Sequence, residues 1–392
     1  MAKGVYIGVD NKARKVKRMY VGVNGVARKI KKAYIGVGGV ARLCYSSGGV
    51  VYCGTNDNTQ VVLPGTGSSP SYAYFGGGMT AAYATGVSTG VHRYDTSLTF
   101  TSADVLSLGR MSVGGCTTPN NEYVIFAGGS NGASLTEQVN TVDIISKSLT
   151  SLTPTSLSVA KWTVITAKAG ASYSVFAGGF ATSGGASKTA EAFNSSLSKL
   201  AAPNLSTTGQ ILSSASVVNY ALFAGGYTTS TSGLTTSYTY DAIVDVYNTS
   251  LTHSTTSLSV GRKDFADARV GNYALFAGGD IRSSSSSKAL SDRVDAYNTS
   301  LTRTTASLSS ARYNLTGAGN DYYALFVGGY DGSNYYTIVD IYDTSLTRTI
   351  GTPITTARGS MYSATVGNYL LFTGGQIGAS TKNTEIFMCV PD

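Results

Sequence analysis

Short apolar runs that end in a Gly pair recur along the chain and set its organisation. One copy runs from Tyr273 to Ala277 and is followed by Gly278-Gly279. The Phe of these runs stands at positions 75, 126, 176, 223, 276, 326 and 372, so successive copies are 46 to 53 residues apart. A period near fifty residues that is built from short apolar runs and Gly-rich turns is typical of a radial array of small sheets.

Each repeat predicts four strands. A first strand such as 265–270 precedes the apolar run, and the run itself is the second strand. The alternating segment 244–247 after the Gly pair predicts a half-buried third strand. A turn at 248–250 follows, because Asn and Asp side chains bond nearby backbone N–H groups, and we expect Leu251 to open a fourth strand. Residues 49–392 are therefore predicted to be an all-β, seven-bladed propeller.

The last repeat contains no fourth strand after its third. Counting back from Phe75 by the spacing of the other repeats leads to the β-prone segment 50–53. We expect this segment to pair with 384–388 as the outer strand of the final blade, which closes the ring and removes an exposed edge.

Three features together resemble kelch repeats: the Phe-x-Gly-Gly ending, a following Val-Asp-x-Tyr strand, and an Arg near the start of the first strand. The resemblance covers about residues 49–392 and implies a kelch-like propeller. The chain lacks the Trp that usually follows the Tyr of the kelch pattern and has a Leu nearby instead, so the resemblance implies no kelch-type partner. The Arg residues concerned are Arg110, Arg262, Arg312 and Arg358.

Residues 1–48 carry a separate repeat with a period of fourteen residues. The pairs Asn24-Gly25 and Gly38-Gly39 stand between β-prone runs and predict tight hairpin turns. Short hairpins alone are marginally stable in water, so we expect this arm to dock on copies of itself or on a larger assembly. The arm resembles repeat segments at the N-termini of phage and prophage structural, tail-associated proteins of Gram-positive bacteria. The expected docking residues are Tyr6, Arg14, Tyr20, Arg28, Tyr34 and Arg42.

The positive charge of the chain belongs to the arm. Eleven of the 29 Lys/Arg and one of the 21 Asp/Glu lie in residues 1–45, so this segment carries +10 and the remainder −2. A solvated basic sheet without a partner is one alternative, and phosphate attraction is another, but no nucleic-acid readout fold is recognisable. We therefore expect protein partners and no nucleic acid. The sequence has no signal peptide and no apolar stretch that could span a membrane, so assembly in the bacterial cytoplasm is expected.

Loop lengths differ sharply between the two ends of the predicted blades. From the aromatic or Ile of strand three to the following Leu there are four residues in six repeats, whereas the step from the Gly pair to strand three ranges from 13 to 22. The connections between strands two and three, and between blades, share one end of a propeller, which we call the variable face. The opposite end is the constant face. Variable loops on a rigid scaffold favour binding at the variable face.

The loops of the variable face are rich in Tyr among Ser, Thr, Asn and Gly. Tyr combines a rigid apolar ring with a polar tip and can stack on sugar faces. The alternative is that several rings pack over the blade tops. The candidate binding residues are Tyr83, Tyr227, Tyr238, Tyr240, Tyr330, Tyr335 and Tyr336.

Catalytic sites find little support in the sequence. Kelch-like folds include copper oxidases, but His92 and His253 are the only histidines and stand near third or fourth strands, so no metal and no cofactor is expected. A glycan hydrolase would need paired carboxylates, for which the loops offer Glu137, Asp241, Asp280 and Asp331. We therefore expect a non-enzymatic phage virion protein that is associated with the tail, fibre or baseplate and presents its variable face to a host polysaccharide or protein. The alternatives are a bacterial carbohydrate- or protein-binding propeller without a virion role and, third, a hydrolase.

Overall fold

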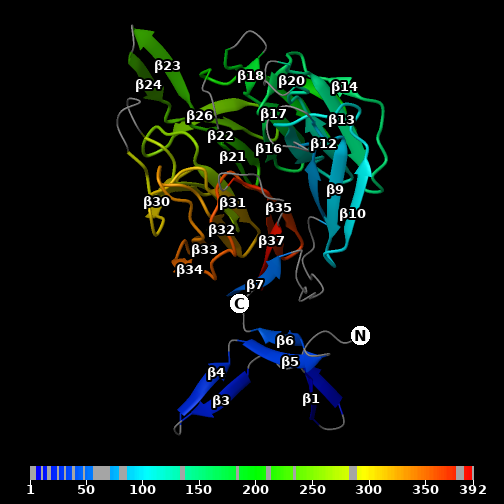
Figure 1. Cartoon of the computed structure of the whole chain (residues 1–392), viewed down its shortest axis with the longest axis vertical. Coiled ribbons are helices and arrows are strands. Elements are labelled where there is room, and N and C mark those ends of the chain that lie inside the picture. The colour runs from blue at the N-terminus through cyan, green and yellow to red at the C-terminus, as the bar shows by residue number, and fades with distance from the viewer. Residues whose placement is uncertain are drawn as a thin grey trace.

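Seven small sheets stand around a central channel and form a β-propeller, with three separate hairpins before it (Figure 1). The described part of this computed structural model contains strands and turns and no helix, which confirms the predicted all-β seven-bladed fold. The structure describes residues 6–9, 12–15, 19–23, 26–30, 32–37, 40–46, 49–55, 71–78, 86–132, 137–181, 185–208, 213–232, 235–281, 289–376 and 384–390.

Every sheet is antiparallel, and consecutive strands run from the channel outward. Six blades have four strands, as predicted, while blade 1 shows three within the described residues. In order from the channel the strands are, for blade 1, β8 (Tyr72–Gly76), β9 (Gly90–Asp95) and β10 (Phe100–Asp104); for blade 2, β11 (Gly114–Thr117), β12 (Tyr123–Ala127), β13 (Thr141–Ser146) and β14 (Thr155–Ser156); for blade 3, β16 (Ile165–Ala169), β17 (Tyr173–Ala177), β19 (Ala190–Phe193) and β20 (Lys199–Ala202); for blade 4, β21 (Ser213–Val217), β22 (Tyr220–Ala224), β25 (Ile243–Tyr247) and β26 (His253–Ser257); for blade 5, β27 (Ala266–Val270), β28 (Tyr273–Ala277), β29 (Arg293–Tyr297) and β30 (Arg303–Ser307); for blade 6, β31 (Thr316–Gly319), β32 (Tyr323–Val327), β33 (Val339–Asp343) and β34 (Arg348–Ile350); and for blade 7, β35 (Tyr362–Val366), β36 (Tyr369–Thr373), β37 (Thr384–Val390) and β7 (Gly49–Thr55).

The N-terminal strand β7 closes the ring, as the sequence predicted. It pairs antiparallel with β37, with Gly49 opposite Val390 and Thr55 opposite Glu385. Gly49 therefore lies at the end of blade 7 where third strands finish, which is the constant face. The preceding residues form three hairpins that Figure 1 shows beside β7, outside the ring: β1 (Tyr6–Val9) with β2 (Lys12–Lys15), β3 (Met19–Val23) with β4 (Val26–Ile30), and β5 (Lys32–Val37) with β6 (Val40–Ser46).

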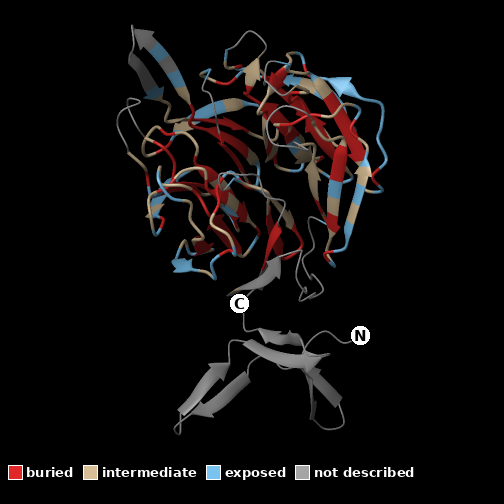
Figure 2. Cartoon of the chain, in the orientation of Figure 1, coloured by how far each residue is buried: buried red, intermediate tan, exposed pale blue. Residues whose placement is uncertain are grey.

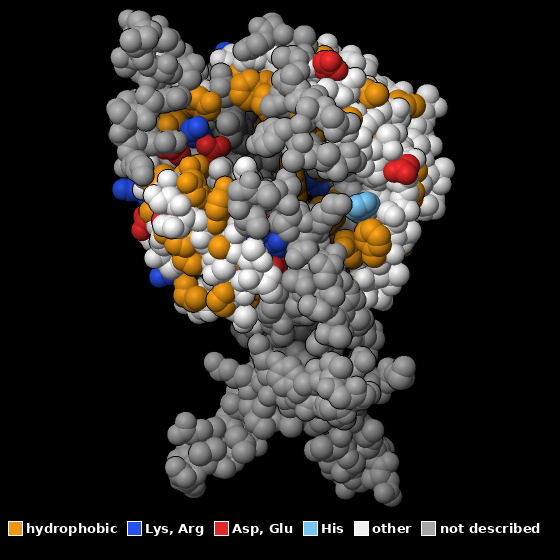
Figure 3. Space-filling view, viewed as in Figure 1, with side chains coloured by type: hydrophobic (Ala, Val, Ile, Leu, Met, Phe, Trp, Pro, Cys, Tyr) orange, Lys and Arg blue, Asp and Glu red, His pale blue; other side chains and the backbone are white. Residues whose placement is uncertain are grey.

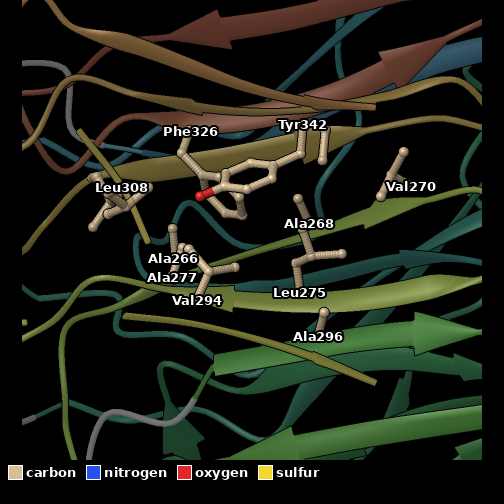
Figure 4. Packing of buried hydrophobic residues seen from close by; sticks show 12 residues of the cluster. Ala266, Ala268, Val270, Leu275, Ala277, Val294, Ala296, Leu308, Phe326 and Tyr342 are labelled. Carbon is tan, nitrogen blue, oxygen red and sulfur yellow. The ribbon is translucent and has the colours of Figure 1, made fainter. Parts of the chain in front are cut away.

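The apolar second strands are the core because neighbouring blades cover both of their faces. In β28, Ala274, Leu275, Phe276 and Ala277 are all fully buried. Figure 4 shows Phe326 and Tyr342 of blade 6 facing the small residues of blade 5, and Figure 2 shows the buried residues running along the inner strands of the ring. Burial on both faces explains why these strands read as continuous apolar runs rather than as alternating ones.

The Gly pair of one blade contacts the repeat Arg of the next blade, and this contact joins the two blades. Gly279 of blade 5 donates its N–H to the carbonyl of Arg312 in blade 6 at 2.8 Å. A Cβ on Gly278 would lie 2.6 Å from that carbonyl, and Gly278 has a φ of 73°, so both approach and backbone require glycine. The guanidinium of Arg312 is fully buried and lies 2.8 Å from Asp340 of β33. Comparable pairs join Arg110 to Asp143, Arg262 to Asp295 and Arg358 to Glu385.

The Leu of each strand-three turn does not open the fourth strand, which corrects the sequence-based prediction. Leu251 has a φ of 57° and sits inside the turn, and β26 begins at His253. Asn248 fixes this turn by accepting hydrogen bonds from the backbone N–H groups of Ser250 and Thr252. A left-handed Leu is unusual, so packing must offset the conformational cost. The same turn carries Leu98, Leu149, Leu197, Leu301 and Leu346.

Candidate binding face

Short backbone bridges extend the blades beyond the Gly pairs at the variable face. One bridge joins the residue after the Arg position to the residue after the Gly pair. A second bridge joins the residue after the Gly pair to a residue that precedes strand three. In blade 6 these residues are Tyr313, Tyr330 and Tyr335. Blade 2 has Met111, Ser130 and Gln138 at the same places, and blade 5 has Lys263, Asp280 and Leu290. A nearly invariant scaffold therefore displays different side chains at equivalent positions.

Blade 6 gathers three tyrosine rings on this face. The ring centroids of Tyr330 and Tyr335 are 4.7 Å apart, and those of Tyr313 and Tyr330 are 5.6 Å apart. All three side chains are half-buried, so part of each ring is accessible. The structure thus brings two predicted binding residues together and adds Tyr313, which the sequence analysis missed because it lies outside the long loops.

Tyr336, the third predicted residue of this blade, stabilises the loop itself. Its hydroxyl donates to Asp331 Oδ2 at 3.0 Å, while Asp331 Oδ1 accepts backbone hydrogen bonds from Ser333 and Asn334 at 2.7 Å. These donors lower the pKa of Asp331 and keep its carboxylate charged. The loop that carries Tyr330 and Tyr335 is therefore fixed before any ligand arrives.

Blade 4 carries a longer hairpin, β23 (Tyr227–Ser232) with β24 (Thr235–Tyr240), which extends from the ring at the upper left of Figure 1. Tyr227 and Tyr240 are opposite each other at its base, with ring centroids 6.2 Å apart. The ammonium of Lys263 lies 4.6 Å from the centre of the Tyr227 ring and 3.2 Å from Asp264. The base of the hairpin thus combines aromatic and charged groups beside blade 5.

Blade 3 contributes an aromatic pair that the sequence analysis did not identify. Trp162 and Phe180 belong to the short strands β15 (Lys161–Trp162) and β18 (Phe180–Ala181), and their rings stack at 4.8 Å with planes 16° apart. Both side chains are half-buried. A signal was present, because these residues directly follow the Arg position and the Gly pair, as Tyr313 and Tyr330 do in blade 6.

Some predicted site residues cannot be placed on this face from the structure. Tyr83 lies outside the described residues, and for Tyr238 only the backbone is described, opposite Thr229. The six docking residues of the arm lie in hairpin strands, and their side chains are likewise outside the described part. Figure 3 shows one face of the ring, on which hydrophobic side chains surround a central hollow.

The loop carboxylates of the variable face are engaged in local structure. Asp241 accepts a short hydrogen bond from Thr207 and another from the N–H of Ile243, and Asp280 is fully buried in its bridge. His253 lies 2.7 Å from Asp245, and burial lowers the pKa of His92. Among the described residues no group of His, Cys, Asp and Glu is arranged to hold a metal ion.

The comparisons with known proteins show the fold. A solved structure described as "Structure of YjhT" is similar with a TM-score of 0.53 at 12% identity, over 71% of this chain and 94% of that chain. Because 449 solved chains match this chain and one fold can serve many functions, the likeness does not separate one function from another. No protein-family model and no curated protein matches the sequence, so the resemblances to kelch repeats and to phage arms stay predictions. Within the described residues no helix is long and apolar enough to cross a membrane.

Proposed function

We propose that this chain is a non-enzymatic binding protein of a phage particle, whose variable face recognises a glycan or protein on the host surface. The observation that carries the binding role is the display of half-exposed aromatic rings from equivalent places of different blades. They are the Tyr313, Tyr330 and Tyr335 cluster of blade 6, and the Trp162 and Phe180 pair of blade 3. Aromatic rings that are held in place by a rigid scaffold suit stacking against sugar faces at low entropic cost.

The virion role rests on the arm. Its hairpins are two-stranded, and such hairpins gain stability by pairing their edges or covering a face. The register of β7 brings the chain in at the constant face, so a partner that holds the arm leaves the variable face accessible. Together with the resemblance to phage tail-associated segments, this arrangement supports docking through residues 1–48 and presentation through the propeller.

The proposal gives the loop acids no catalytic role. Asp331 is held as a charged turn residue by its backbone donors, whereas a general acid needs a raised pKa. A bacterial propeller without a virion role is the second candidate, and the composition of purified particles separates the two. We expect mass spectrometry to find the full-length chain in particles and to find none of a chain that lacks residues 1–48. Equal incorporation of both forms would remove the arm from the proposal.

The binding role is tested with Tyr330→Ala combined with Tyr335→Ala. Loss of a central aromatic pair costs on the order of 2 kcal/mol or more, so we expect binding to host cells to weaken at least about thirtyfold. Phe100→Ala is the matched control, because this aromatic side chain is 50% exposed on β10, away from the variable face. Binding that survives the Tyr variant, or that falls equally in the control, would contradict the proposed site.

A further inference from the structure

The seam between blades 6 and 7 brings a tyrosine ring and an amide side chain together at the variable face. Gly359 follows Arg358, and Gln376 follows the Gly pair of blade 7, so they take the places that Tyr313 and Tyr330 take in blade 6. Gly359 and Gln376 exchange both backbone hydrogen bonds, at 3.1 and 2.8 Å. Two residues that are paired in this way have their side chains on the same face of the sheet.

Tyr335 of blade 6 lies over Gly359. A Cβ built on Gly359 would be 3.5 Å from Cε1 of the Tyr335 ring. The Cβ atoms of directly paired residues are about 5 Å apart, so the side chain of Gln376 begins close to this ring and on the same face. A long side chain at position 359 would stand between the two. The equivalent residues of other blades do have long side chains, namely Met111, Trp162, Lys263 and Tyr313.

The amide of Gln376 is available to a ligand. The Gln376 side chain is exposed, and within the described residues its amide makes no hydrogen bond to the rest of the chain. The neighbouring ring is held in place, because the Tyr330 ring lies 4.7 Å from that of Tyr335 and the loop of Tyr335 is fixed by its own hydrogen bonds. The seam therefore offers a fixed aromatic ring beside a group that both donates and accepts hydrogen bonds.

We propose that Tyr330, Tyr335 and Gln376 form a subsite for one neutral pyranose unit, an inference that rests on the proposed recognition of a glycan at the variable face. A pyranose ring has an apolar face of C–H groups and a rim of hydroxyl groups. The Tyr335 ring suits the apolar face. The Gln376 amide has two N–H donors and one carbonyl acceptor, which suit neighbouring hydroxyl groups of the rim. We call these three residues the pyranose subsite.

The charges around the pyranose subsite favour a neutral sugar over an acidic one. The loop that carries Tyr335 also holds the Asp331 carboxylate, which its backbone donors keep charged. The Arg residues at this end of blades 6 and 7, Arg312 and Arg358, are fully buried and paired with acids. The described loops of this seam thus present a carboxylate and no exposed cation, so a uronic acid or a phosphorylated sugar would be repelled.

The test titrates the isotope-labelled full-length chain with methyl β-glucopyranoside and with methyl β-galactopyranoside. We expect a saturable shift of the side-chain amide signal of Gln376 with at least one of the two sugars. In Gln376→Ala, followed through the ring signals of Tyr335, that sugar should bind about tenfold more weakly, because the hydrogen bonds of the amide are lost. Asn219→Ala is the matched control, because it removes an exposed amide from the turn after β21 at the constant face and should leave the affinity unchanged.

The uronide that matches the bound sugar tests the charge argument. It has a carboxylate in place of the hydroxymethyl group, and we expect it to bind about threefold or more weakly than the neutral sugar. Asp331→Asn should narrow this difference, because it removes the charge and keeps an oxygen that accepts from Ser333 and Asn334.

Three results would overturn the proposal: no saturable shift with either neutral sugar, equal weakening in the two Ala variants, or a uronide that binds as tightly as the neutral sugar. Host-cell binding of the combined Tyr330→Ala and Tyr335→Ala variant tests the proposed function separately. If host cells still bind through these two rings while neither sugar shifts Gln376, the pyranose subsite is wrong and the variable face recognises another ligand. Sugar binding at Gln376 by a chain that does not bind host cells would support the subsite and contradict the host role.

Discussion

The buried ion pairs at the blade seams make a sharp prediction about stability. Asp340 Oδ2 lies 2.8 Å from the fully buried guanidinium of Arg312. Asp340 Oδ1 accepts a hydrogen bond at 2.9 Å from Arg348, whose side chain is partly exposed. Asp340→Asn keeps the shape of the side chain and removes its charge. Arg312 then remains charged in a buried site without its counterion. Such losses typically cost about 3 to 5 kcal/mol, and we expect about 3 because three backbone carbonyls still accept from Arg312.

Blade 4 contains the matched control for this substitution. Gly209 occupies the Arg position of that repeat in the sequence, and Asp245 accepts instead from the N–H and hydroxyl of Ser206 and from His253. Asp245→Asn therefore leaves no buried guanidinium without a counterion, and about 1.5 kcal/mol is expected, the lower end of the range for a hydrogen bond to a charged group. Urea unfolding at pH 7 measures both variants. Equal costs would refute the reasoning that the buried Arg, and not the aspartate alone, sets the magnitude.

Two further predictions follow from the same structure. Burial raises the pKa of Asp267 from 3.8 to about 6. The Asp267 carboxyl group therefore ionises at lower pH in the unfolded chain than in the folded chain, so the stability that it contributes falls as the pH rises from about 4 to about 6. The loss is up to about 3 kcal/mol. Asp267→Asn should remove that part of the pH dependence in unfolding measurements at pH 4 and pH 7, and an unchanged pH profile would contradict it. Removal of residues 1–57 deletes β7 and should lower the melting temperature, whereas removal of residues 1–48 should not; equal melting temperatures would contradict the contribution of β7 to closure.

Much of the fold could be predicted because its signals repeat. The Gly pairs and the third-strand aspartates predicted the seven blades. The lack of a fourth strand after the last repeat predicted closure by residues 50–53, which the structure shows as part of β7 (Gly49–Thr55). The left-handed Leu of the turns could not be predicted, because isolated Leu avoids positive φ and only packing across the seam offsets that cost.

The candidate site was only partly predictable. Tyrosines in long loops indicated the variable face, and Tyr330 and Tyr335 do meet there. Trp162, Phe180 and Tyr313 were missed because they stand at motif edges, where the residue type varies between repeats while the backbone does not. Composition draws attention to loops, whereas the geometry shows that equivalent short bridges display these rings.

The most direct test of the central claim is a hydrogen-exchange footprint of the full-length chain bound to polysaccharide purified from the host surface. The account predicts added protection at the variable face, in residues 313 and 330–336 and at the base of the blade 4 hairpin. The strand-three turns of the constant face, such as 343–347, should exchange as in the free protein. Protection confined to those turns, or no change at 330–336 under saturating ligand, would contradict recognition by the variable face.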